Sequence, residues 1–236
     1  MSRQSLCMVV VVSVLSLWLG TPVWAQHSSL SLNLGYFAVR GEATPISDDV
    51  IAENLNLGLF AFALDQFNNA SVGAEWLVQF GEYVETGFGV GSHQQTVLSG
   101  YNDFVKEGGT EITQDFKLRV TPVTATARVF PFGQQSAVQP YAGAGVGFFS
   151  WRYSETGEFV DFNTFDVFRE RFVAEGSDVG TVYLGGLRVL TGSRLTVGLE
   201  VRYQDVQGVV GIDQGFLDER IDLRELTTSF TFNVQF

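Results

Sequence analysis

The sequence predicts an all-β fold: an eight-stranded antiparallel up-and-down barrel that crosses a membrane. Three observations predict it. Beyond residue 28, segments with a hydrophobic period of two follow one another, and none shows a convincing helical period. The connections between these segments alternate between long and short. Six charged residues of the segments all fall on the face that is not apolar.

The first three expected strands cover 29–40, 70–80 and 84–97. In each, large apolar residues alternate with Ser, Asn, Gln, Glu or Gly. An extended chain places alternate side chains on opposite faces, so each segment has one apolar and one polar face. The apolar positions are Leu30, Leu32, Leu34 and Tyr36, then Val72, Ala74, Trp76, Val78 and Phe80, then Val84, Phe88 and Val90.

The fourth expected strand, 115–130, changes phase. Its first apolar residues, Phe116, Leu118 and Val120, are even-numbered, and its later ones, from Val123 onward, are odd-numbered. A β-bulge shifts the phase by one, and Pro is tolerated at bulges because it cannot donate to the ladder. We therefore expect a bulge at Thr121-Pro122.

Four further segments complete the expected barrel: 140–153, 177–190, 195–204 and 224–236. The alternation is clearest in the last, where Phe230, Phe232, Val234 and Phe236 alternate with Thr, Asn and Gln. In the other three, the apolar positions are Ala142, Ala144, Val146 and Phe148, then Val179, Tyr183, Leu187 and Val189, then Leu195, Val197, Leu199, Val201 and Tyr203.

The connections indicate how the strands are joined. Long ones follow the first, third, fifth and seventh strands, and shorter ones follow the others. This alternation predicts long extracellular loops at one end, short periplasmic turns at the other, and both termini at the short-turn end. The long connections are 41–69, 98–114, 154–176 and 205–223.

The segment 57–67 in the first long connection is apolar on both faces. Two alternatives stay open from the sequence. It extends the second strand above the membrane, or it folds back as a small hairpin or cap.

The charged residues indicate which face points inward. An Arg on the lipid face at mid-bilayer costs about 2–4 kcal/mol, so a membrane barrel directs its charged face to the lumen. A soluble barrel would invert this arrangement. The expected strands exceed the length of about five or six residues usual in soluble proteins, which favours the membrane barrel. Aromatic residues of the apolar face also fall near strand ends, as in an interfacial girdle: Phe80, Phe116, Tyr203 and Phe236.

The six charges predict what fills the lumen. An eight-stranded barrel is wide enough only for its own side chains. Counting from the short-turn ends places three Glu and three Arg in the lower half, with Lys117 and Arg119 higher. We expect these six to pair and plug the barrel, and the alternative is scattered charge in a wet pore. The six are Glu75, Glu85, Arg128, Arg188, Glu200 and Arg202.

Residues 1–25 have the pattern of a cleaved secretory signal peptide. Arg3 precedes an apolar run, and small or modest side chains precede the expected cleavage between Ala25 and Gln26. The alternative, a membrane-anchoring helix, is disfavoured because the run is short and interrupted by serines. The remaining 26–236 is expected to form one barrel domain.

Composition and spacing exclude several functions. The net charge is −12 and no block of Lys and Arg is present, which argues against nucleic acid as a partner. Cys7 is the only cysteine, so no thiolate metal site is expected in the exported chain. Ser92 and His93 are adjacent, and adjacent strand residues face opposite sides, so they cannot pair in catalysis. We expect no catalytic residue, no metal site, no cofactor and no enzymatic activity.

These features together resemble the bacterial outer-membrane β-barrel superfamily, with its small OmpA-like, OmpX-like and OmpW-like barrels. The resemblance rests on the signal peptide, the eight strands, the segments PVTATARVFP and QPYAGAGVGFF, and the terminal Phe236. It implies export to the outer membrane of a Gram-negative bacterium, contact with outer-membrane lipid and lipopolysaccharide, and a monomer.

The resemblance also implies a role for the C-terminal strand. In that superfamily, a last strand with alternating apolar residues and a final Phe is recognised by the barrel-assembly machinery. By resemblance, this role falls to Phe230, Phe232, Val234 and Phe236. An interfacial anchoring role of Phe236 is compatible with it.

The superfamily contains conduits, structural anchors, adhesion proteins and a few lipid-modifying enzymes. We expect a structural or narrow-conduit, porin-like role for small solutes. The alternative is a surface adhesion or interaction protein that acts through its acidic extracellular loops. An outer-membrane lipid-modifying enzyme is the third alternative.

Overall fold

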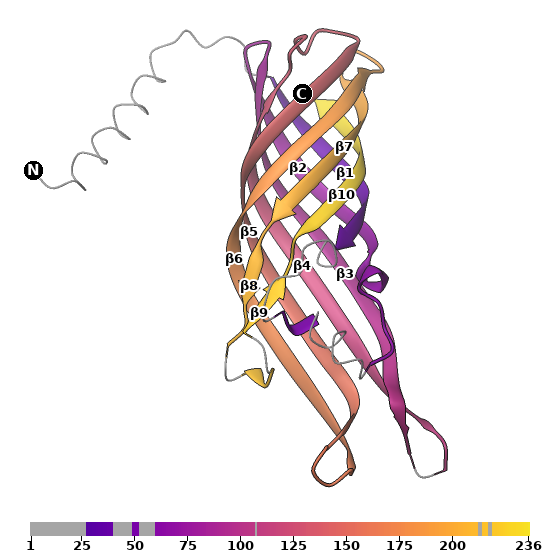
Figure 1. Ribbon diagram of the computed structural model, residues 1–236. Coiled ribbons are helices and arrows are strands. Elements are labelled where there is room, and N and C mark those ends of the chain that lie inside the picture. Colours follow the sequence, from indigo (N-terminus) through magenta and orange to yellow (C-terminus); the bar gives the residue numbers. More distant parts are fainter. Residues whose placement is uncertain (1–26, 40–48, 52–59, 107, 212–213, 217–218) are drawn as a thin grey trace, which may run out of the picture.

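The chain closes an eight-stranded antiparallel barrel in the computed structural model, which describes residues 27–39, 49–51, 60–106, 108–211, 214–216 and 219–236 (Figure 1). Around the barrel the strand order is β1-β10-β7-β6-β5-β4-β3-β2, so the prediction of an all-β up-and-down barrel is confirmed. The strands are β1 (Ser28–Val39), β2 (Asn69–Phe80), β3 (Val84–Val105), β4 (Glu111–Val129), β5 (Val138–Val160), β6 (Val167–Leu190), β7 (Leu195–Asp205) and β10 (Glu225–Gln235).

The last strand closes the barrel against the first. β10 pairs with β1 from Ser29↔Gln235 to Val39↔Glu225, and it pairs with β7 on its other side. Closure pairs every barrel strand on both sides in the part of the barrel nearer the short turns. The beginning of β1 and the end of β10 lie at the end of the barrel that carries the short turns, opposite the long hairpins (Figure 1).

Four neighbouring strands are much longer than the others. β3, β4, β5 and β6 have 22, 19, 23 and 24 residues, whereas the remaining barrel strands have 11 or 12. The prediction of loops at 98–114 and 154–176 is wrong, because strand pairing continues through most of both segments, to Val105↔Glu111 and Val160↔Val167. Two long hairpins therefore project from one end of the barrel (Figure 1).

The interior of the barrel changes character along its axis. In β4, Thr124, Thr126 and Arg128 point inward in the lower part, which is the half of the barrel nearer the short turns and is drawn at the top of Figure 1, and all three are buried. In the upper part of the same strand, the inward residues Phe116 and Leu118 are buried among apolar side chains. The lumen is therefore polar near the short turns and apolar toward the hairpins.

The exterior changes in the opposite sense. Lower outward residues of β4, such as Val123 and Val129, are apolar and exposed, and upper ones, such as Lys117 and Arg119, are charged and exposed. The outward residues of the lower part form an apolar belt around the barrel. Its large members include Leu30, Leu32, Leu34, Val72, Trp76, Phe88, Val90, Val123, Val129, Val146, Phe148, Val179, Tyr183, Leu187, Leu199, Val201, Phe230, Phe232 and Val234.

The exchange of polarity between the inner and outer faces makes two predictions about β4 wrong: the bulge at Thr121-Pro122 and the interfacial position of Phe116. Pro122 lies opposite Phe149 in an unbroken register, so no bulge occurs there. Even-numbered residues point inward along the whole strand, and only the polarity of their surroundings changes at Pro122. Phe116 is consequently fully buried in the upper lumen rather than in an interfacial girdle, whereas Phe80 and Phe236 are exposed and Tyr203 is partly exposed.

The described part of the segment 57–67 folds back into the upper lumen as a cap. It contains the short 3-10 helix η3 (Leu64–Phe67), and the side chains of Phe60 and Phe67 are buried in the apolar core. Ala61 N donates a hydrogen bond to Gly100 O at 2.8 Å, which ties the cap to β3. Of the two alternatives, the cap is the one that residues 60–67 adopt, and 57–59 lie outside the described residues.

Two further predictions concern the connection 205–223 and the signal peptide. The connection 205–223 contains the paired strands β8 (Gln207–Val209) and β9 (Arg220–Asp222). The predicted signal peptide, 1–25, lies outside the described residues. Within the described part of the chain, no helix is long and apolar enough to cross a membrane.

The apolar belt generates a stability prediction. Leu199 lies in the middle of the β7 part of the belt and points outward. If the belt contacts hydrocarbon, Leu199→Arg should lower the free energy of unfolding by about 2–4 kcal/mol, measured by denaturant titration in lipid vesicles. Thr156→Arg, at an exposed site of the projecting β5, should change it by no more than about 0.5 kcal/mol. Equal effects of both substitutions would contradict membrane contact at the belt.

Candidate functional site

The lower lumen holds a network of six charged side chains contributed by five strands; five are buried and one, Arg202, is partly buried. Because hydrophobic residues occupy the outward positions there, the alternation of each strand turns its charged residues inward. The structure brings all six predicted residues together in one set of ion pairs, with three carboxylates and three guanidinium groups. They are Glu75 of β2, Glu85 of β3, Arg128 of β4, Arg188 of β6, and Glu200 and Arg202 of β7.

Arg128 lies at the centre of this network. Its Nη2 donates to Glu75 Oε2 at 2.5 Å and to Glu200 Oε2 at 3.2 Å. Its Nη1 is 3.7 Å from Glu85 Oε1, an ion pair without a hydrogen bond. The guanidinium therefore contacts all three carboxylates of the network, and only 1% of its side chain is exposed.

The other two arginines complete the pairing. Arg188 binds Glu85 through two hydrogen bonds of 3.0 and 2.9 Å, the geometry in which guanidinium and carboxylate match best. Arg202 Nη2 donates to Glu200 Oε1 at 2.8 Å and to Glu75 Oε2 at 3.2 Å. Every charge of the network thus has an opposite charge in contact.

Neutral side chains that sequence reasoning missed also belong to the site. Tyr141 donates from its hydroxyl to Glu200 Oε2 at 2.9 Å, and Thr126 donates to Glu75 Oε1 at 3.1 Å. The guanidinium carbon of Arg188 lies 4.7 Å from the ring centre of Tyr141 and 5.3 Å from that of Phe130. The alternation along the sequence could have indicated that Tyr141, Thr126 and Phe130 face the lumen, since each is next to outward apolar residues.

Gly87 provides the space that the network needs. A Cβ atom at this position would collide with Glu75 Oε1 and Arg128 Nη1. The inward face of β3 is therefore open where the side chains of β2 and β4 meet. This observation explains in part why glycine accompanies the charges on the polar face.

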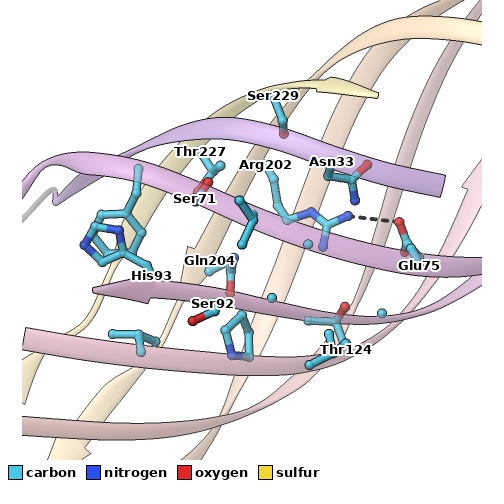
Figure 2. Close-up of a pocket in the computed structure, with 18 of the residues that line it drawn as sticks. Asn33, Ser71, Glu75, Ser92, His93, Thr124, Arg202, Gln204, Thr227 and Ser229 are labelled. Carbon is cyan, nitrogen blue, oxygen red and sulfur yellow. Dashed lines mark hydrogen bonds and ion pairs between the residues drawn. The ribbon is translucent and has the colours of Figure 1, made fainter. Parts of the chain in front are cut away.

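A second layer blocks the lumen above the ionic network, so the lumen has two closures, one ionic and one apolar. Phe67 of the cap, Phe116 of β4 and Tyr153 of β5 are all fully buried in the upper apolar core. Between the two layers lies a cavity of about 60 Å³. Figure 2 shows Asn33, Glu75, His93, Thr124, Arg202 and Ser229 among the residues that line it.

His93 supports the cap rather than pairing with Ser92. Its ring stacks on Phe37 with 3.5 Å between centroids, and its Nε2 is 3.2 Å from Phe67 O. The side chain of Ser92 points outward and is exposed, while that of His93 points inward and is 3% exposed. The two residues lie on opposite faces of β3 and form no catalytic pair.

One residue of the upper part is shared between the cap and both hairpins. The Tyr101 ring packs against Phe60 at 4.8 Å, and its hydroxyl accepts a hydrogen bond from Val160 N at 3.2 Å. Burial raises the pKa of Tyr101 above its ordinary value, so the phenol stays neutral across the physiological range. Among the residues that the structure describes, no cluster of three or more His, Cys, Asp or Glu side chains is arranged to hold a metal ion.

Of the four residues assigned by resemblance to assembly recognition, three point outward on β10 and the fourth, Phe236, follows its last residue. Phe230, Phe232, Val234 and Phe236 are 62%, 41%, 51% and 73% exposed. Phe236 N donates to Ser28 O at 3.0 Å, which fixes the last residue beside the start of β1. Their recognition by assembly machinery stays a prediction.

Solved structures of similar shape are found among bacterial outer-membrane proteins. Neisserial surface protein A matches with 13% sequence identity over 89% of this chain and 97% of its own, at a TM-score of 0.50. OprG, an outer membrane protein of Pseudomonas aeruginosa, matches with 11% identity over 89% and 97%, also at 0.50. The chain has the fold of a small outer-membrane β-barrel. No protein-family model and no curated protein matches the sequence.

At these identities the likeness establishes the fold and leaves the activity open. The attachment invasion locus protein Ail of Yersinia pestis matches at 13% identity over 90% of this chain and all of its own, with a TM-score of 0.46. The protease OmpT of Escherichia coli matches at 8% identity with a TM-score of 0.40. These two scores are too low to carry a functional argument.

The network generates a second stability prediction. Arg128→Met keeps much of the side-chain volume but leaves Glu75, Glu85 and Glu200 with one cation fewer, so it should cost about 3–5 kcal/mol of unfolding free energy in vesicles. Lys106→Ala removes a partly exposed pair with Glu158 and should cost about 1 kcal/mol or less.

A double variant separates charge from packing. Arg128→Met combined with Glu75→Gln restores charge balance and should be less destabilising than Arg128→Met alone. Equal or greater destabilisation of the double variant would show that packing, not ion pairing, dominates at Arg128.

Proposed function

We propose that this protein is an integral outer-membrane barrel with a closed lumen and a structural role, in which the barrel anchors the projecting β3–β4 and β5–β6 hairpins. The observation that carries the proposal is the pair of closures in series: the ionic network in the lower lumen and the capped apolar core above it. The apolar belt and the structural likeness to outer-membrane barrels support the location.

Both closures oppose passage of a solute. Opening the lower one separates buried ion pairs, and an uncompensated buried charge costs about 3–5 kcal/mol. The upper one is an apolar core with packed aromatic rings, for example Phe60 against Phe116 at 5.2 Å. The cavity between them, at about 60 Å³, has room for only a few waters. A structural role is therefore better supported than a narrow conduit.

A non-enzymatic role forms part of this proposal. The six charged groups of the ionic network are engaged with one another, and Ser92 lies on the opposite face from His93. A nucleophile needs an adjacent base within hydrogen-bond reach, which this serine lacks in His93. Hydrolysis of lipid A by the purified protein would contradict the proposal.

Conductance measurements test the closed lumen. In planar bilayers, the native protein should show no steady conductance. Arg128→Met alone and Phe67→Ala alone should also stay closed, because each leaves the other closure in place, whereas the combination should conduct. Heat-modifiable migration on gels verifies that each variant is folded. A steady, solute-sensitive conductance of the native protein would favour the conduit instead.

A surface-interaction function is a second candidate, favoured by the tip of the β5–β6 hairpin. Phe165 has a φ of 62°, a conformation that bulky residues rarely adopt, and its side chain is 67% exposed. Phe162 beside it is 49% exposed and packs edge-on against Phe104 of the other hairpin at 5.7 Å. Exposed aromatic residues held in an unfavourable turn conformation are typical of binding sites.

Adhesion measurements test this second candidate. Vesicles carrying the Phe162→Ser/Phe165→Gly variant should attach to protein-coated beads at least several-fold less than vesicles carrying the native protein. Phe132→Ser removes an aromatic side chain that is 69% exposed in a turn at the opposite end, and it should have no effect. Equal attachment of all three would exclude the hairpin tip as an adhesive surface.

A further inference from the structure

The outward face of β4, β5 and β6 changes in three successive rows where the apolar belt ends. The uppermost apolar row is Val123–Phe148–Val179, and the register places these residues directly beside one another. The next row, about 7 Å further along the strands, is hydroxylated: Thr121, Ser150 and Ser177. The third row is charged: Arg119, Arg152 and Glu175. The face thus changes from hydrocarbon-compatible to cationic within a few residues.

The two arginines of the third row are direct cross-strand neighbours. Arg119 of β4 lies opposite Arg152 of β5, and both side chains are exposed. Like charges directly opposite each other on a sheet are destabilising unless an anion lies between them. In the described part of the chain, neither Arg119 nor the nearby Lys117 has an ion-pair partner. This cationic cluster stands out on a chain whose net charge is −12.

The one carboxylate in the cluster neutralises it only weakly. Glu175 Oε2 is 3.5 Å from Arg152 Nε, and the two side chains are 62% and 51% exposed. Exposed pairs of this kind contribute about 0–1 kcal/mol. A phosphate, which accepts bidentate hydrogen bonds from guanidinium groups, can displace such a carboxylate.

An apolar groove lies below the cationic cluster and is lined mainly by residues of β2 to β5. It has a volume of about 540 Å³ and runs over the outward face of the barrel. Its lining includes the small residues Ala74 and Ala125 and the large aromatic residues Trp76, Phe88 and Phe148. The Val123–Phe148–Val179 row belongs to its lining, so the groove reaches the hydroxylated row above. Small residues framed by large aromatic ones leave room for a lipid chain.

We propose that this face binds a phosphorylated, anionic membrane lipid. Its phosphate lies between Arg119 and Arg152, its polar headgroup contacts the hydroxyl row, and an acyl chain occupies the groove. The inference rests on the proposed membrane location, because the groove takes a chain only if the belt lies in a bilayer. The lipid belongs to the leaflet on the side of the hairpins, where the cationic row lies.

Native mass spectrometry of the detergent-solubilised protein tests the proposal, with diphosphoryl lipid A as the probe. The native protein should retain this lipid in preference to phosphatidylcholine. Arg119→Gln/Arg152→Gln should weaken its binding at least tenfold. Arg169→Gln/Arg171→Gln makes the same charge change at exposed positions further along β6, and it should alter binding less than twofold.

A further variant and a competitor identify the occupant. Ala125→Leu fills the groove without changing charge, and it should weaken lipid A binding at least threefold. Millimolar inorganic phosphate should not displace the lipid. Unchanged binding in Arg119→Gln/Arg152→Gln, equal loss in the control pair, or full displacement by inorganic phosphate would each overturn the proposal.

Failure of this inference differs from failure of the closed-barrel proposal. An inserted, heat-modifiable and non-conducting protein that binds lipid A no better than phosphatidylcholine would contradict the lipid site alone. A protein that does not insert into vesicles, or that conducts steadily, would contradict the proposed function.

Discussion

The strict in-and-out alternation of the barrel strands is the constraint on which the rest of the structure depends. Along each strand the same alternate residues face inward from one end to the other, although the polarity of the lumen and of the outer face changes on the way. In the lower part, the outward face is apolar and the lumen holds ionic groups; in the upper part, the outward face is charged and the lumen is apolar. Because parity is fixed, an exchange of polarity between the odd and even positions of a strand appears as opposite changes outside and inside the barrel.

This constraint explains why two dissimilar layers fill one lumen. Charged side chains of the lower strands cannot face hydrocarbon, so they point inward and must neutralise one another there. The upper strands stand clear of the belt and form an ordinary apolar core, to which the cap contributes Phe60, Leu64 and Phe67. Gly87 leaves space for the side chains of the ionic layer. His93 contacts the cap that completes the apolar layer.

Sequence patterns predicted the strands and the six charges well because both depend on parity, which is local. The patterns failed at Pro122 and Phe116, where the polarity of the two faces exchanges and imitates a shift of phase. The same exchange concealed the upper halves of β3 to β6, which read as loops. Tyr141 and Thr126 were missed because a neutral side chain on the inward face does not by itself indicate a partner, whereas a buried charge requires one.

The sequence separation within the ionic network has a consequence for the order in which the barrel forms. Arg188 and Glu85 are 103 residues apart, and Arg202 and Glu75 are 127 apart. A half-built sheet that holds β2 to β4 but lacks β6 and β7 contains Glu75 and Glu85 with Arg128 as their sole cation from the network. Charge balance arrives only with the late strands, so completion of the cylinder is favoured over any intermediate that stops short of it.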